Sequence, residues 1–254
     1  MKLRVLGCSG GIGGNLRTTS MLLDHDVLID AGTGVGDLSL AEMAVIDHVF
    51  VTHSHLDHIA SIPLMVDSVG MMRSKPLIVH ATADVIGILK QHIFNWKIWP
   101  DFSVIPTVNE PCLRFEALEL GETLNLGGRK ITPLPVNHSV PAIGFWLDSG
   151  SASLVFSGDT TTCAALWQEI NRIDNLQYLL VETAFSNTEQ ALAEKSKHYC
   201  PNLLAKDIAT LRQQPEIYIT HLKPGEVELT MQEISQCGGR FTLRMLQNGQ
   251  EFEF

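Results

Sequence analysis

The feature that most constrains the fold is the stretch VFVTHSHLDHIA, residues 49–60. It holds four side chains of the kinds that bind metals: His53, His55, Asp57 and His58. Residues 44–52 form an apolar run of strand length, and residues 55–73 have the apolar spacing of a helix. Because side chains at i and i+2 of an extended chain share a face, His53 and His55 can reach one ion together. Asp57 and His58, at the turn into the helix, can face a second ion. A histidine-rich surface turn is the alternative, but it does not account for the flanking strand and helix.

Three other segments end an apolar, β-type run on a residue of the same kind. The segments are PVNHSVPAIGF, VFSGDTTT and YITHLKPG, and the residues are His138, Asp159 and His221. Taken singly, each of these residues is better explained as an ordinary hydrogen-bonded polar residue than as a metal ligand. Because all four segments share one construction, we expect them to meet in one site. Its donors are nitrogen and oxygen only, which suits Zn²⁺, Mn²⁺ or Fe.

Strands and helices alternate along most of the chain. Apolar patterns predict strands at 2–7, 44–52, 75–80, 176–182, 216–220, 240–246 and 251–254, a hairpin at 18–31, short strands between 113 and 156, and helices at 55–73, 83–94, 162–173 and 202–213. The segments DVLIDAG and SLVFSGD each bring an aspartate next to a glycine at a strand end, which indicates two similar halves. We therefore expect a single α/β domain over residues 1–254, built as a layered sandwich.

The order HxHxDH, His, Asp, His resembles that of metallo-β-lactamase-fold hydrolases, and the resemblance extends from LIDAG to THLKP. It implies a four-layer αββα sandwich with two divalent ions, Zn²⁺ first and Mn²⁺ or Fe as alternatives. By this resemblance one ion is held by His53, His55 and His138, the other by Asp57, His58 and His221, with Asp159 bridging both. Asp30 matches the aspartate that orients the first histidine loop in this family, which suits the need to fix ligand tautomers.

Four further segments, HSVPAIGF, SGDT, VETAF and KSKHYCPNLLAKDI, resemble ribonuclease Z and the class II cyclic-nucleotide phosphodiesterases. This resemblance implies that His198 is a general acid for the leaving oxygen, that Glu182 steers it, and that Asp57 belongs to the catalytic set. An acid is needed because a metal-activated hydroxide is a nucleophile and cannot protonate a departing alkoxide. The alternative for His198 is an ordinary residue at the start of a helix.

The expected substrate is a small phosphodiester. Ribonuclease Z carries a long tRNA-binding arm between the residues that match His138 and Asp159, whereas here only residues 139–158 separate them, and they read as two short strands. A net charge of −10 also disfavours a nucleic acid partner. HSHLDHIASIPLM resembles the class II signature, so we expect a hydroxide between two metals to open a 3′,5′-cyclic nucleotide of the cAMP or cGMP type. The alternatives are a ribonuclease Z-like or general phosphodiesterase, and a silent metal-binding regulatory protein.

The cysteine content and the apolar runs of the sequence indicate the cellular compartment in which the protein is expected. The five cysteines are far apart and form no CxxC pair, so we expect free thiols and a cytoplasmic protein. No run of roughly 18 apolar residues exists, so no membrane span is expected. VLGC resembles a lipoprotein cleavage box, but the apolar stretch that must precede Cys8 is missing, so we expect a chain mature from Met1. A homodimer is left open.

Two other patterns have competing interpretations. GCSGG, residues 7–11, fits a GxSxG nucleophile elbow, but the glycines that follow discourage the helix that an elbow needs. We expect a loop at the edge of the site, whose N–H groups can contact a phosphate. Trp96, Trp99 and Phe102 are expected to form a satellite core rather than a platform for stacking bases.

Overall fold

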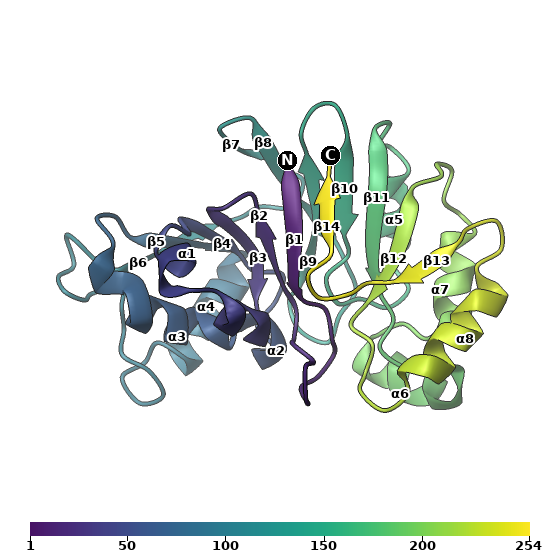
Figure 1. Ribbon diagram of the computed structural model, residues 1–254, viewed down its shortest axis with the longest axis horizontal. Helices are drawn as coiled ribbons and strands as arrows, with labels where there is room; N and C mark the ends of the chain where they lie inside the picture. The colour runs from purple at the N-terminus through teal and green to yellow at the C-terminus, as the bar shows by residue number, and fades with distance from the viewer.

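Two seven-stranded mixed sheets face each other in the computed structural model, which describes residues 1–254 (Figure 1). The first sheet has the order β14 (Glu251–Glu253), β1 (Lys2–Gly7), β2 (Ser20–Leu23), β3 (Val27–Ala31), β4 (His48–Phe50), β5 (Leu77–Ala81), β6 (Leu113–Ala117). The second has the order β13 (Leu243–Met245), β12 (Glu216–Thr220), β11 (Leu176–Glu182), β10 (Ser153–Phe156), β9 (Ile143–Asp148), β8 (Arg129–Pro135), β7 (Leu124–Leu126). The N- and C-terminal strands β1 and β14 pair side by side.

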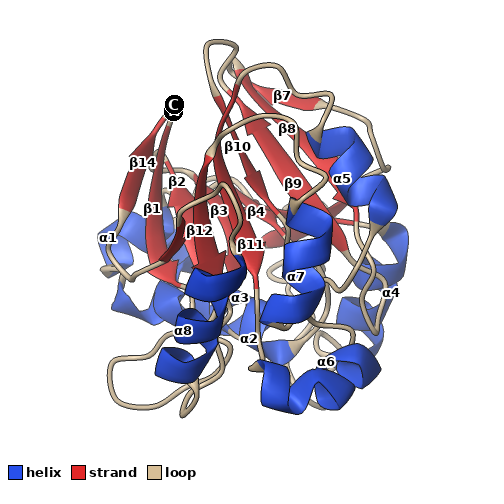
Figure 2. Ribbon diagram, turned by 90° about the vertical axis from the view of Figure 1, so that its right-hand side faces the viewer, coloured by secondary structure: helices blue, strands red, loops and turns tan.

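Helices cover both outer faces. On the first sheet lie α1 (Leu40–Ala44), α2 (Leu56–Ile59), α3 (Ser61–Val69) and α4 (Ala83–His92). On the second lie α5 (Ala164–Ile170), α7 (Pro201–Ile208) and α8 (Val227–Cys237), with α6 (Gln190–Ser196) at its lower edge (Figure 2). Separate apolar cores form under each helical layer and between the sheets. The expected four-layer αββα sandwich is confirmed.

The two aspartate-bearing strands occupy equivalent places. β3 is the fourth strand of the first sheet, and β10 is the fourth strand of the second. Asp30 lies in β3, and Asp159 follows β10 after two residues. β3 and β4 run parallel, as do β10, β11 and β12, so their carboxyl ends meet at one edge of each sheet. The two similar halves expected from the sequence are therefore present, and each contributes its central strand to the same edge.

Two elements of the structure are shorter than the sequence predicted. The strand expected at 44–52 shrinks to β4, because Ser39 and Glu42 form a reciprocal capping box that starts α1 and draws Ala44 into that helix. The helix expected at 55–73 divides into α2 and α3 followed by a 3-10 turn. Pro63 has no N–H to donate to the carbonyl of Ile59, so regular helical bonding is interrupted where α2 ends.

The aromatic residues after α4 differ in their burial. Phe102 is buried in the core beneath the first helical layer and Trp99 packs against it, as expected. Trp96, by contrast, is 65% exposed, so it is not part of the satellite core. No helix combines the length and apolar character needed to cross a bilayer.

Candidate metal centre

The seven predicted metal ligands and the predicted His198–Glu182 pair converge at the shared edge of the sheets. His53 follows β4, His138 follows β8, and His221 follows β12, so each ligand stands just beyond a strand. The two sheets are joined at this point, because the amide of Ile143 donates to the carbonyl of Thr52 at 3.0 Å. Segments directly after strands, together with α2 for Asp57 and His58, therefore hold the side chains, rather than one mobile loop.

One group of ligand atoms comes from His53, His55, His138 and Asp159, and these atoms lie within 4.8 Å of one another. Nε2 of His53 is 3.6 Å from Oδ2 of Asp159. Nε2 of His138 is 3.2 Å from Nδ1 of His55. His53 and His138 are buried, whereas His55 is half-buried and borders the solvent side.

A second group comes from Asp57, His58, Asp159 and His221, again within 4.8 Å. Nε2 of His58 is 3.4 Å from Oδ1 of Asp159, and Nε2 of His221 is 3.2 Å from Oδ2 of the same carboxylate. Asp57 faces His221 at 3.1 Å and is the most exposed carboxylate of the group, at 26%. Asp159 belongs to both groups, as expected of a bridging residue.

The donor atoms of both groups fit divalent ions. His53 Nε2, His58 Nε2 and Asp159 Oδ1 are buried and have no hydrogen-bond partner. Two ligands that bind one tetrahedral zinc at about 2.1 Å are about 3.4 Å apart. This is close to the 3.2–3.6 Å that separate Asp159 from Nε2 of His53, His58 and His221. Buried polar atoms left without partners are costly in the absence of an ion. These groups could therefore hold two metal ions.

Hydrogen bonds behind the ligands fix their tautomers. Asp30, fully buried, lies 2.7 Å from Nδ1 of His58 and also accepts the amide and hydroxyl of Thr52, each at 2.8 Å. Since the Thr52 hydroxyl proton goes to Asp30, its oxygen accepts from Nδ1 of His53 at 3.0 Å. Nδ1 of His138 donates to the carbonyl of Lys197 at 3.0 Å. In all three rings Nε2 is left to face the centre.

The electrostatics of the centre favour cation binding. Burial lowers the pKa of His53 far below its ordinary value and lowers that of His138 to about 4, so both rings are neutral, the form that binds metals. For His58 burial acts in the same direction, but the carboxylates of Asp159 and Asp30 outweigh it and raise its pKa. Burial would raise the pKa of Asp159, yet His221 and His58 hold it well below its usual range. The negative charge that favours a proton on His58 would equally favour a metal cation at the same place.

Glu182 and His198 form a pair beside the centre. Oε1 of Glu182 is 2.8 Å from Nδ1 of His198, and the same carboxylate accepts the amides of Thr160, Ala184 and Tyr199 at 3.0, 3.1 and 3.3 Å. Nδ1 of His198 also lies 4.0 Å from Asp159. Burial lowers the pKa of His198, but the Glu182 carboxylate outweighs it and the net shift is upward. His198 is therefore biased toward its protonated form next to the metal groups.

The loop after β1, expected at the edge of the site, contacts His221 in a way that the sequence did not predict. Gly10 packs so closely on His221 that a Cβ there would lie 2.5 Å from its carbonyl oxygen and 2.8 Å from Nδ1. The ammonium of Lys223 donates to the carbonyl of Gly10 at 2.7 Å, and its charge reaches His198. Ser9 is buried and interacts with Leu222 and the amide of Gly11, with no histidine partner, so the nucleophile-elbow alternative does not apply. The Gly10 and Gly11 amides are both engaged inside the protein.

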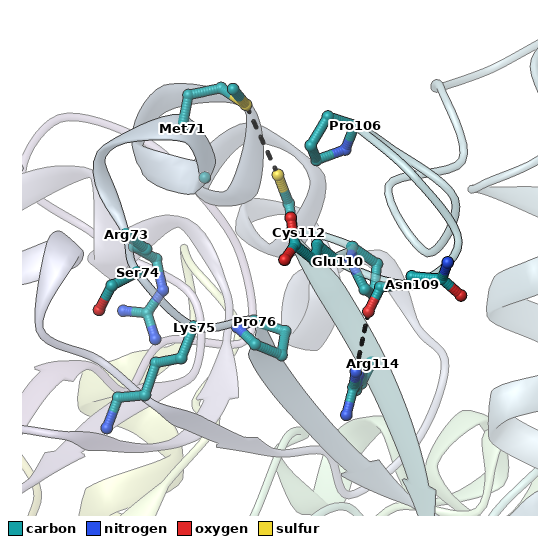
Figure 3. A pocket seen from close by; sticks show the side chains of 12 residues that line it. Met71, Arg73, Ser74, Lys75, Pro76, Pro106, Asn109, Glu110, Cys112 and Arg114 are labelled. Carbon is teal, nitrogen blue, oxygen red and sulfur yellow. Dashed lines mark hydrogen bonds between the residues drawn. The ribbon is translucent and has the colours of Figure 1, made fainter.

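A separate pocket of about 330 Å³ lies at the opposite edge of the first sheet (Figure 3). It is formed by residues 70–76 and 106–114, which lead into the amino ends of β5 and β6. Two of its cations, Arg73 and Lys75, are paired with Asp47 outside the pocket lining. It holds none of the candidate metal-ligating side chains, which gather near the carboxyl ends of the strands.

Residues 25–243 match the Beta-lactamase superfamily domain, and the chain belongs to this superfamily with the metallo-β-lactamase fold. Among its relatives, a probable 3′,5′-cyclic-nucleotide phosphodiesterase of Yersinia pestis is 24% identical over 70% of this chain, which covers only 57% of that protein. Ribonuclease Z of Pyrobaculum islandicum is 22% identical over 87% of this chain and 86% of its own length. The crystal structure of unliganded yeast PDE1 superposes with a TM-score of 0.82 at 16% identity, covering 98% of each chain.

Proposed function

We propose that the protein is a metal-dependent phosphodiesterase that opens a 3′,5′-cyclic nucleotide. The observation that carries the proposal is the His198–Glu182 pair, at 2.8 Å, beside two clusters of nitrogen and oxygen ligands. Two divalent cations bound there supply an activated water and neutralise charge on the phosphoryl oxygens. The remaining requirement of the reaction is a proton for the leaving oxygen, and this pair is built to deliver one.

In this reaction the water oxygen forms a bond to phosphorus while the bond from phosphorus to the 3′ oxygen breaks. His198 donates the proton on Nε2 to that oxygen, since Nδ1 is held by Glu182. Glu182 keeps the ring oriented and raises its pKa. We assign Asp57, the most exposed carboxylate of the centre, the task of orienting the attacking water. The water releases one proton to solvent, and His198 recovers one after the product leaves.

A small substrate is supported by what lies between His138 and Asp159. The segment forms only the antiparallel pair β9 and β10, joined by a turn at residues 149–152, with no protruding arm. The net charge of −10 acts against a polyanion but affects a small phosphodiester far less. Relatives named as cyclic-nucleotide phosphodiesterases support the same choice.

A ribonuclease Z-like activity is the second candidate, because relatives named ribonuclease Z align over most of the chain. The test is turnover of cAMP, cGMP, 2′,3′-cyclic nucleotides and an unprocessed tRNA, side by side, with protein loaded with Zn²⁺ or Mn²⁺. We expect 3′,5′-cyclic nucleotides to be preferred. Preference for tRNA would overturn the substrate, and inert protein with full metal content would point to a regulatory metal-binding protein.

Two variants test the assigned roles. His198→Ala should lower turnover of cyclic nucleotide by roughly a hundredfold or more while still binding about two metal equivalents. His92→Ala, on the exposed end of α4, is the matched control for loss of a histidine. Asp57→Ala should lower both turnover and metal content. A His198→Ala variant with full activity would contradict the general-acid assignment.

A further inference from the structure

Tyr199, the residue after His198, is fully buried, and both functions of its hydroxyl are used. The hydroxyl donates to Oδ2 of Asp207 at 2.5 Å and accepts from Nε1 of Trp167 at 3.1 Å. Burial, and then the Asp207 carboxylate, raise the pKa of Tyr199 above its ordinary value, so the phenol keeps the proton that it donates. Trp167 lies in α5 and Asp207 in α7, so the hydroxyl joins two helices beneath His198.

The same network has two connections toward the metal centre. Oδ2 of Asp207 also accepts the amide of Cys163 at 3.3 Å, four residues beyond Asp159. The amide of Tyr199 donates to Oε2 of Glu182 at 3.3 Å. The phenol is thus connected to the segment that carries Asp159 and to the carboxylate that holds His198.

The chain around His198 depends on this anchor. His198 lies between α6 and α7, next to Lys197, which adopts a left-handed conformation with φ 57°. On one side the amide of His198 is held by the carbonyl of Ala193 at 2.9 Å. On the other side Tyr199 enters an apolar core that includes Leu166, Ile170 and Leu204. Two directional hydrogen bonds at the hydroxyl add to this packing and fix the depth of the ring in the core.

We propose that Tyr199, held by Asp207 and Trp167, is a positioning residue that sets the place of the His198–Glu182 pair for proton transfer to the leaving oxygen. The inference rests on the proposed function, since His198 must protonate that oxygen for its position to matter. It predicts a defect confined to substrates whose leaving group needs a proton. An alkoxide, as in a cyclic nucleotide, needs one, whereas p-nitrophenolate departs as a stable anion.

The experiment compares Tyr199→Phe with wild type on cAMP and on bis-p-nitrophenyl phosphate, both with full metal content. We expect kcat for cAMP to fall roughly tenfold or more, with KM and the rate on the nitrophenyl ester unchanged. Tyr178→Phe is the matched control, because its hydroxyl only accepts from the neighbouring Gln177 at the surface. Val66→Ala, in the core of the other half, controls for lost stability and should not separate the two substrates. An equal fall on both substrates, or no fall on cAMP, overturns the proposal.

A second measurement does not depend on turnover. The proton between His198 Nδ1 and Glu182 should give a far-downfield ¹H resonance, assigned by its loss in His198→Ala. In Tyr199→Phe we expect this resonance to shift or broaden, and in Tyr178→Phe to stay in place. If the wild type hydrolyses neither ester, the proposed function fails, and the resonance alone decides whether Tyr199 positions His198. An unchanged resonance in Tyr199→Phe overturns the positioning role.

Discussion

Asp30 and Asp159 face opposite nitrogens of the same ring: Oδ2 of Asp30 is 2.7 Å from Nδ1 of His58, and Oδ1 of Asp159 is 3.4 Å from Nε2. Each aspartate stands at the end of the fourth strand of its sheet, so equivalent positions in the two halves have different tasks. The shorter distance is a hydrogen bond that fixes the tautomer. The longer distance matches the separation of two ligands that bind the same ion.

Asp30→Asn should weaken the site of Asp57, His58 and His221 by roughly tenfold to a hundredfold in metal affinity. The single amide oxygen can accept from only one of the two Thr52 donors, and the side chain no longer holds the Nδ1 proton of His58 with a charge. Calorimetric titration of metal-free protein with Zn²⁺ measures the effect. We expect the step that involves His58 to weaken more than the step that involves His53, because Asp30 reaches His53 only through Thr52; equal weakening of both steps would contradict the direct role of Asp30 at His58.

The ligands themselves were predictable because they follow strands or, in the case of Asp57 and His58, lie in the helix α2 that comes after one. HxHxDH is dense enough to be recognised alone, and His138, Asp159 and His221 repeat one local construction, so parallel strands bring them to one edge. Among the residues that hold the ligands, Asp30 was predicted in the same way, but the contacts of the others have no such mark. Gly10 matters only because His221, distant in sequence, packs against it. A contact between segments so far apart is decided by the tertiary fold and leaves no local pattern.

Helices α8 and α1 were not predicted from the sequence, α8 because its apolar pattern is weak and α1 because its residues were interpreted as part of a strand. In α8 only Thr230 and Ile234 are buried, which is too few positions to define an apolar stripe. The start of α1 did carry a signal, Ser39 followed by Glu42 three residues later, but the apolar run after it favoured a strand. Tyr199, Asp207 and Trp167 come from three separate segments and become a network only when α5 packs on α7.

Gly10→Ala should damage the centre without touching a ligand. The new Cβ would press on the carbonyl and the ring of His221 at 2.5 and 2.8 Å, and the nearer contact is a backbone oxygen, which leaves little room to yield. We expect His221 to move and affinity for the second ion to fall roughly tenfold. Gly36→Ala is the control, because nothing lies within 4 Å of the added methyl group. Retained affinity in Gly10→Ala would show that the loop moves aside freely.

Removal of metal should lower thermal stability. The unpaired nitrogens of His53 and His58 and the oxygen of Asp159 are buried together, so an ion that binds them binds the folded state and not the unfolded chain. Zn²⁺ at about a thousand times its Kd would add about 4 kcal/mol to the free energy of unfolding. Scanning calorimetry with chelator and then with Zn²⁺ tests this. Asp159→Ala, which lacks the shared ligand, should lose most of the increment, and a full increment in that variant would remove the case for a bridging carboxylate.

His80 should make the metal-free protein less stable in acid. Its ring is buried against Phe50, 4.4 Å between centroids, and Nε2 lies 2.9 Å from Nδ1 of His48. Burial, and then His48, lower the pKa of His80 from 6.5 to about 4. Between these values the unfolded chain binds the proton and the folded chain does not, so stability is complete above pH 6.5 and falls as the pH drops. The loss attributable to His80 reaches about 2 kcal/mol at pH 5.

Urea unfolding of wild type and His80→Phe at pH 7.5 and pH 5, both with chelator, isolates this contribution. The phenyl ring retains the contact with Phe50 and cannot take up a proton, so the variant should lose less stability between the two pH values than wild type. His92→Phe reports what loss of an exposed imidazole does by itself. Equal losses in wild type and His80→Phe would mean that the folded protein accepts the proton on His80, and that the ring is less enclosed than its burial between the sheets implies.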